Sequence, residues 1–176
     1  MNRRTLVMAG AGAAAAAAGL GWQLSRSPVA VAGALPDEAA LAFWQARFAQ
    51  TDGTELAMSS FRGQPLVLNF WATWCPPCVK EMPELDRFAR QFASQKGKVL
   101  GLAVDNPKAV RDFLRKLPVS YAIGLAGFDG TDLSRKLGNA TGALPFTVLF
   151  DRQGAVRQRK LGETTYDELM GWTKSL

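Results

Sequence analysis

The stretch that decides the fold is PLVLNFWATWCPPCVKEMPEL, residues 65–85. It opens with a continuous apolar run over residues 65–72, which is typical of a strand covered on both faces of a sheet. The residues after the run predict a helix from Pro76 to about Gln95. Between the two lie Cys75 and Cys78, the only cysteines of the chain. The sequence therefore places a CxxC pair where a buried strand meets a helix.

The composition limits what this pair can do. The chain of 176 residues contains no histidine, which excludes a mixed Cys/His zinc site and a haem-attachment CxxCH motif. Two thiolates alone do not complete the tetrahedral shell of a zinc ion. Disulfide scaffolds are small and dense in cysteine, and this chain has only two. Redox exchange remains, as does binding of Cu(I), which prefers soft thiolate ligands.

Residues 1–24 predict an export signal or a membrane anchor. Arg3 and Arg4 precede an uncharged run from Thr5 to Ser25, and this arrangement sends the following chain out of the cytoplasm. The run is roughly long enough to cross a bilayer, whereas the small residues 30–32 fit a cleavage site. We expect a periplasmic domain, cleaved from this segment or tethered to the inner membrane by it. The paired arginines leave both the general and the twin-arginine export routes open.

The charge of the chain argues against a nucleic-acid partner. Of 21 basic residues, three precede residue 33, whereas all 15 acidic residues lie at Asp37 or later. The processed chain would carry 18 basic and 15 acidic groups, which makes only a mildly basic surface. We expect no nucleic-acid partner, and we expect a monomer.

Residues 25–40 predict a linker, because proline and glycine interrupt them, and residues 41–176 predict one domain. Residues 41–50 fit either an edge strand or a short helix. The remaining pattern predicts strands over residues 98–104 and 120–126, helices over 107–117 and 131–138, an antiparallel hairpin over 145–162, and a last helix over 164–176 capped by Thr164 or Thr165. This order predicts an α/β fold in which a mixed sheet carries helices on both faces.

A helical wheel places one carboxyl group where an apolar residue is expected. Cys78 shares a buried stripe with four apolar residues of the helix, which are Met82, Leu85, Phe88 and Phe92. Glu81 lies on the same stripe, one turn beyond Cys78. A carboxylate there breaks the amphipathic pattern and suggests a function, although Glu81 could instead turn to solvent or pair with a lysine.

The helix also distinguishes the two cysteines. Cys75 precedes the first turn, where the helix dipole favours a thiolate, so we expect its sulfur to be exposed and to attack a partner disulfide. Cys78, one turn inside, is expected to resolve the mixed disulfide. Pro76 and Pro77 remove two backbone donors that could have stabilised the Cys75 thiolate, which favours a reductant over an oxidant. Trp74 should cover the active surface.

The sequences NFWATWCPPCVKEMPEL and FRGQPLVLNFWATWC, with a later Leu-Pro pair that opens a strand, resemble the exported TlpA-like (ResA-type) thiol-disulfide oxidoreductases of the thioredoxin superfamily. The resemblance covers roughly residues 51–176 and implies the thioredoxin fold. Asn69 takes the place of the buried Asp of cytosolic relatives, and Glu81 matches the active-site glutamate of the TlpA-like group. The resemblance further implies a cis peptide bond at Pro145, with Leu144 free to pair with an extended partner, although a trans proline at a strand start fits the sequence as well.

The resemblance implies a reductant of specific protein disulfides outside the inner membrane, such as those of apocytochrome c or of a copper-site protein. Its electrons would come from a membrane thiol donor, because the sequence contains no cofactor motif and we expect neither a cofactor nor a resident metal. Two alternatives stay open: an exported disulfide oxidant or isomerase, and a Cu(I)-binding chaperone that uses the two thiolates.

Overall fold

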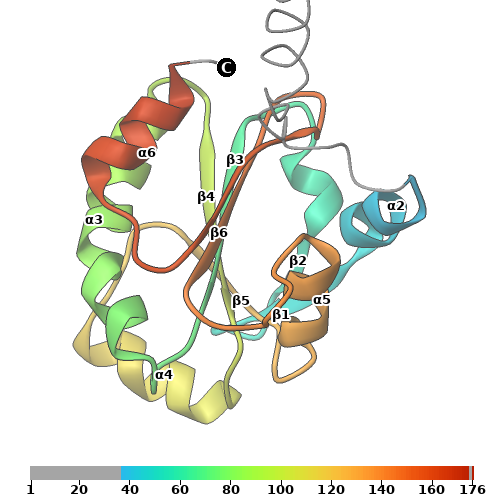
Figure 1. The fold of residues 1–176 in the computed structure, drawn as a ribbon. Coiled ribbons are helices and arrows are strands. Elements are labelled where there is room, and N and C mark those ends of the chain that lie inside the picture. The colour runs from blue at the N-terminus through green and yellow to red at the C-terminus, as the bar shows by residue number, and fades with distance from the viewer. Residues whose placement is uncertain (1–36, 175) are drawn as a thin grey trace, which may run out of the picture. The chain divides into compact units, whose positions relative to one another are not determined.

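The computed structural model describes residues 37–174 and 176 of the chain (Figure 1). A seven-stranded sheet lies at its centre, with the order β2-β1-β5-β4-β3-β6-β7. The strands are β1 (Arg47–Gln50), β2 (Glu55–Ala57), β3 (Leu66–Trp71), β4 (Lys98–Ala103), β5 (Ala122–Leu125), β6 (Phe146–Phe150) and β7 (Val156–Leu161). The three strands β3, β4 and β5 run parallel, and the other neighbours pair antiparallel. The prediction of a mixed sheet is confirmed.

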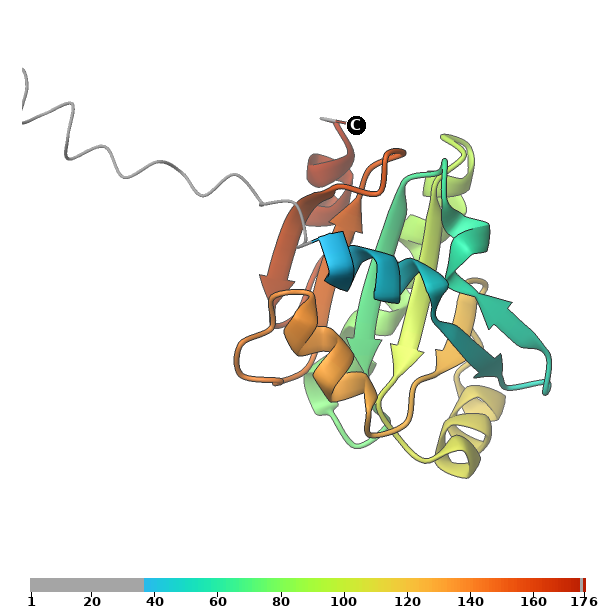
Figure 2. The same ribbon diagram turned by 90° about the vertical axis from the view of Figure 1, so that its right-hand side faces the viewer.

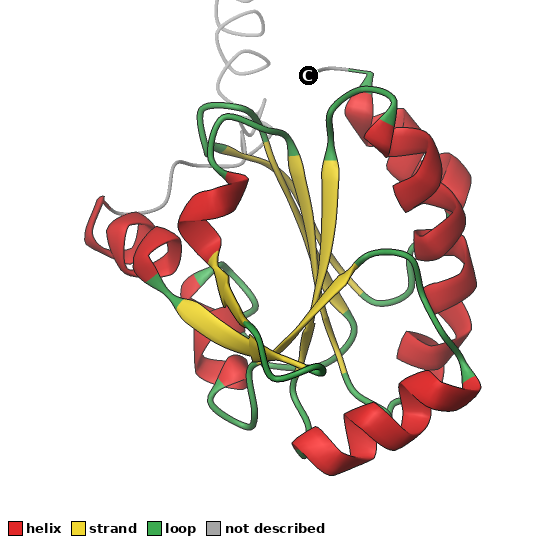
Figure 3. Cartoon of the chain, turned by 180° about the vertical axis from the view of Figure 1, so that it is seen from behind, coloured by secondary structure: helices red, strands yellow, loops and turns green. Residues whose placement is uncertain are grey.

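Helices cover both faces of this sheet, as predicted (Figures 1 and 3). They are α2 (Asp37–Gln45), the 3-10 helix η1 (Met58–Phe61), α3 (Pro76–Ala93), α4 (Pro107–Lys116), α5 (Gly130–Lys136) and α6 (Tyr166–Thr173). The side chains of α3, α4 and α6 pack on one face. On the other face lie α2 and α5, which Figure 2 shows in front of the strands.

Strand β3 holds the two layers together because all six of its side chains are buried. Leu66, Leu68 and Phe70 join the core under α2. Val67 and Trp71 point to the opposite face and join the core that contains the cysteines. This alternation explains why the strand has no polar face in the sequence, since both of its faces are covered.

Two expectations about the start of the domain need correction. Residues 41–50 are neither one strand nor one helix, because α2 ends at Gln45 and β1 begins at Arg47. Helix α2 begins at Asp37, so residues 37–40, which were predicted to be linker, are helical. The predicted signal or anchor, residues 1–24, lies outside the described residues.

None of the helices in the described part of the chain has the length and apolar character needed to cross a membrane.

Candidate active site

The two cysteines form a disulfide at the start of α3, with Cα atoms 5.3 Å apart. Cys75 is the N-cap residue of the helix, and its sulfur accepts a hydrogen bond from the Cys78 N–H at 3.3 Å. The N-cap position normally receives N–H groups from the second or third helical residue. The second residue here is Pro77, which has no N–H, so the motif offers the Cys75 sulfur a single backbone donor.

The observed difference in exposure between the two cysteines is much smaller than the sequence predicted. In this disulfide form Cys75 is 4% exposed and Cys78 is fully buried. The prediction of an exposed Cys75 sulfur is therefore wrong for the oxidised protein, because Cys75 packs into the core that contains Ala72 and Cys78, against which Leu144 also packs. Trp74 does lie at the surface, with 62% exposure, whereas Trp71 packs in the core against Phe113.

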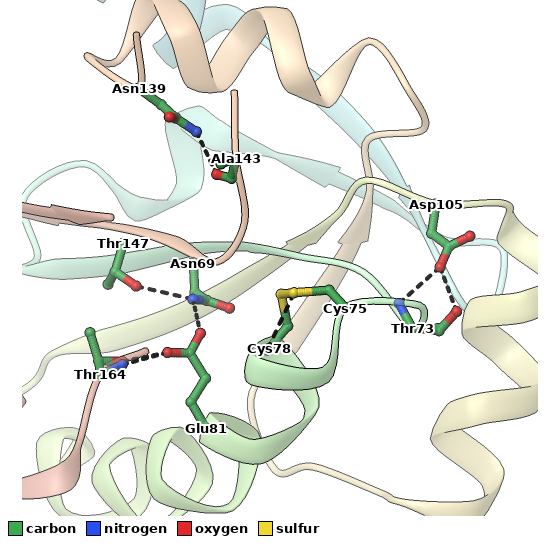
Figure 4. Close-up of a disulfide and its surroundings, with 10 residues drawn as sticks. All are labelled: Asn69, Thr73, Cys75, Cys78, Glu81, Asp105, Asn139, Ala143, Thr147 and Thr164. Carbon is green, nitrogen blue, oxygen red and sulfur yellow. Dashed lines mark hydrogen bonds between the residues drawn. A yellow bond between two sulfur atoms is a disulfide. The ribbon is translucent and has the colours of Figure 1, made fainter. Parts of the chain in front are cut away.

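Glu81 is fully buried beside the cysteines, as the helical wheel predicted (Figure 4). One carboxylate oxygen accepts a hydrogen bond from the Asn69 side-chain amide at 2.7 Å. The other accepts from the Thr164 backbone N–H at 2.7 Å and from its hydroxyl at 2.9 Å. The alternatives in which Glu81 turns to solvent or pairs with a lysine are wrong.

These surroundings bring the pKa of Glu81 close to neutral pH. Burial raises the pKa of Glu81 from its ordinary value of 4.5 to about 7. The hydrogen bonds from Thr164 and Asn69 favour the carboxylate and oppose this rise, while the nearby Glu163 carboxylate adds to it. A group that is close to half protonated at neutral pH can both take up and release a proton there.

Asn69 links Glu81 to the sheet. Its amide nitrogen also donates to the Thr147 hydroxyl at 3.0 Å, and Asn69 and Thr147 are paired residues of β3 and β6. The Asn69 side-chain oxygen is buried without a hydrogen-bond partner among the described residues. Sequence reasoning missed Thr147 and Thr164. The cap of α6 is Thr165, whose hydroxyl accepts from the Glu168 N–H, and this leaves Thr164 to bind Glu81.

The Leu144–Pro145 peptide bond is cis, as the resemblance implied, and the trans alternative is wrong. Phe146 of β6 pairs with Phe70 of β3. The residues just before β6 therefore lie beside the end of the strand that leads to the cysteines. Pro145 is buried and Leu144 is half-buried.

A second carboxylate, also missed in the sequence, holds the loop before Cys75. Asp105 is 5% exposed and accepts from the Thr73 N–H at 2.9 Å and the Thr73 hydroxyl at 2.6 Å (Figure 4). It lies two residues after the end of β4, the parallel neighbour of β3. The carboxyl ends of parallel strands meet at one edge of the sheet, so the strand pairing could have indicated this contact.

This arrangement of an N-cap cysteine, a buried second cysteine and a titrating carboxyl agrees with the comparisons to known proteins. The family model described as Redoxin matches residues 32–170. The chain belongs to the Redoxin family. Within this family it is 30% identical to the thiol-disulfide oxidoreductase ResA of Geobacillus kaustophilus, over 95% of this chain and 93% of that protein. It is 29% identical to ResA of Bacillus cereus, over 71% of this chain and 70% of that protein.

A solved structure of a similar protein supports the fold. The structure of MTB DsbF in its mixed oxidised and reduced forms superposes with a TM-score of 0.65 and 26% identity, covering 76% of this chain and 96% of that one. The predicted thioredoxin fold and ResA-type membership are confirmed. This Redoxin-family protein is a thiol-disulfide oxidoreductase, and its Cys75–Cys78 pair is suited to that exchange. Among the described residues, no group of three or more His, Cys, Asp or Glu side chains could hold a metal ion.

Proposed function

We propose that this oxidoreductase is a reductant of specific protein disulfides and acts outside the inner membrane. The direction of electron flow is inferred from the surroundings of Cys75, whose sulfur receives only one backbone hydrogen bond within the motif. Strong oxidants of this class owe their potential to a stabilised reduced form. With Pro77 at the second helical position, the reduced thiolate loses one such stabilising donor, and the disulfide form is favoured.

In the proposed reaction the Cys75 thiolate attacks one sulfur of the partner disulfide. The partner's second sulfur leaves as a thiolate, and a mixed disulfide joins Cys75 to the partner. Cys78 then loses its proton and attacks the Cys75 sulfur, which releases the partner's first sulfur as a thiolate. The protein has lost two electrons and closed its disulfide, while the partner has gained both electrons.

Glu81 is proposed to receive the Cys78 proton. It is one helical turn beyond Cys78 on the same buried face of α3, and its pKa of about 7 allows it to accept a proton at neutral pH. Asn69 and Thr164 would stabilise the carboxylate before the transfer. Proton transfer by such a positioned group requires hydrogen-bond reach, directly or through one water.

The proposed partners are those that the resemblance implies: apocytochrome c or a copper-site protein as the substrate, and a membrane thiol protein as the electron donor. The proposed contact surface for the partner protein consists of Trp74, Pro76, Pro77, Leu144 and Pro145. The proposed location is periplasmic, and the predicted N-terminal segment could remain as a tether.

The direction can be tested with a synthetic peptide whose CxxCH motif is either closed as a disulfide or fully reduced. The reduced protein should convert the closed peptide to the dithiol, and the oxidised protein should leave the dithiol peptide unchanged, as followed by acid quenching and mass spectrometry. The Cys78→Ser variant should stop at a mixed disulfide on Cys75. Oxidation of the dithiol peptide by the oxidised protein would instead identify an oxidant.

A further inference from the structure

The loop before the cis peptide bond is held by one buried side chain. Asn139 is 2% exposed and follows α5. Its backbone N–H donates to the Ser134 carbonyl at 3.0 Å, and its amide nitrogen donates to the Ser134 hydroxyl at 3.2 Å. Gly138, with a φ of +106°, turns the chain between the helix and Asn139. Asn139 is thus anchored to the end of a helix.

From this anchor the Asn139 side chain reaches forward along the loop. Its amide nitrogen donates to the Ala143 carbonyl at 2.9 Å (Figure 4). Its oxygen accepts from the Gly142 N–H at 3.1 Å and from the Thr141 hydroxyl at 3.2 Å. The Thr141 hydroxyl in turn accepts from the Ala143 N–H at 3.2 Å. Both backbone groups of Ala143, the residue before Leu144, are therefore satisfied through this network.

The residue on the other side of Leu144 is held as well. The Pro145 carbonyl accepts from the Gly162 N–H at 2.8 Å. The Leu144 side chain packs against both cores. In contrast, we find no hydrogen bond to the Leu144 N–H or carbonyl within residues 37–174. Leu144 is the one residue of residues 143–145 whose backbone groups are left for a partner.

We propose that Asn139 is a positioning residue that holds the Leu144 backbone ready to pair with an extended polypeptide. This inference rests on the proposed function, because it assumes that the substrate is a protein segment. An extended chain can form two hydrogen bonds with the Leu144 N–H and carbonyl, and a small disulfide has no such backbone to offer. Fixing these groups in advance removes the ordering cost from the encounter. Asn139 should therefore raise the rate with polypeptide disulfides and leave the cysteine chemistry unchanged.

Two probes with the same leaving group separate these effects. The first is a nine-residue extended peptide whose central cysteine carries a thionitrobenzoate mixed disulfide. The second is N-acetylcysteine amide with the same mixed disulfide. In each case the Cys75 thiolate attacks the cysteine sulfur and releases the thionitrobenzoate anion, which is the better leaving group and is coloured. Cys78 then closes the protein disulfide and releases the probe's thiol.

With the full reduced chain, we expect the peptide to react about tenfold faster than the amino-acid probe. The Asn139→Ala variant should lose most of this tenfold preference. Its rate with the amino-acid probe should stay within twofold of the parent rate, and its reduction potential should equal that of the parent within error. Thr141→Ala, at an exposed position, should lose about threefold in the same selective way and serves if Asn139→Ala folds poorly. Asp52→Ala removes two hydrogen bonds from the distant β1–β2 turn and controls for general destabilisation.

Equal losses with both probes would overturn the inference, because they would show general damage to the site. Unchanged peptide preference in both loop variants would overturn it as well, as would a parent protein without any preference for the peptide. None of these results concerns the direction of electron flow, which the CxxCH peptide and the reduction potential report separately.

Discussion

Replacing Glu81 by Gln should change how stability depends on pH. In the wild-type protein the pKa of Glu81 is raised by burial from 4.5 to about 7. Well below pH 4.5 the carboxyl is protonated in both the folded and the unfolded state, so it does not change the free energy of unfolding. Between pH 4.5 and 7 the unfolded chain releases the proton first, so the free energy of unfolding falls as the pH rises. Well above pH 7 the carboxyl is ionised in both states, and the free energy of unfolding falls no further.

The size of this effect follows from the two pKa values. The difference between 4.5 and about 7 corresponds to about 3 kcal/mol. Glutamine has the same shape and does not titrate, so the Glu81→Gln variant should carry a constant offset from its altered hydrogen bonds. Relative to wild type, the variant should therefore gain about 3 kcal/mol of stability between pH 4.5 and pH 8.

Urea unfolding of the oxidised protein at half-unit pH intervals measures this difference. The exposed Glu55→Gln variant defines how far the loss of one surface carboxyl changes the curve. In parallel, alkylation of the reduced protein should show a change of rate near pH 7 in wild type that Glu81→Gln lacks. Parallel unfolding curves for wild type and Glu81→Gln, together with unchanged alkylation profiles, would refute the raised pKa and its role.

Three further predictions concern the residues around the site. Thr164→Val keeps the backbone donor to Glu81 but removes the hydroxyl donor, so the pKa of Glu81 should rise, and the midpoint of the alkylation profile should move to higher pH; a midpoint that falls would contradict this. Pro77→Ala restores a backbone donor at the second helical position and should raise the reduction potential by about 30 mV, whereas Pro76→Ala, the matched control at the first position, should change it less; equal shifts would argue against the donor explanation. Asp105→Asn weakens the hydrogen bonds that hold the loop before the disulfide and should lower the free energy of unfolding by about 1–2 kcal/mol, measured by urea unfolding at pH 7; an unchanged value would show that the loop does not depend on this carboxylate.

Local patterns in the sequence were sufficient for the central strand, the helix and the redox pair. The phase of the helix alone placed Glu81 on the buried stripe with Cys78, because one turn of a helix fixes which side chains share a face. The prediction for residues 41–50 failed because these residues span the boundary between α2 and β1. A single period cannot describe a segment that contains two kinds of element.

The partners of Glu81 could not be predicted for a different reason. Thr164 lies 83 residues further along the chain, and its contact depends on how β7 and α6 pack against α3. Either Thr164 or Thr165 fits the cap of α6 equally well in sequence, so the pattern did not show which one was free. Asn139 was missed because its role depends on backbone groups that the fold leaves open at Leu144.

The enclosure of Cys75 also depends on tertiary packing. A helix N-terminus indicates where a thiolate is stabilised, but the exposure of the residue is set by the core into which Cys75 packs with Trp71 and Ala72.

The most direct test of the proposed reductant role is the equilibrium reduction potential of the Cys75–Cys78 pair, measured with the full chain against glutathione. A reductant requires a value near that of thioredoxin, about −270 mV, or lower. We expect this result because Pro77 withholds a donor from the Cys75 thiolate. A value near about −120 mV, which is typical of a strong oxidant, would contradict it.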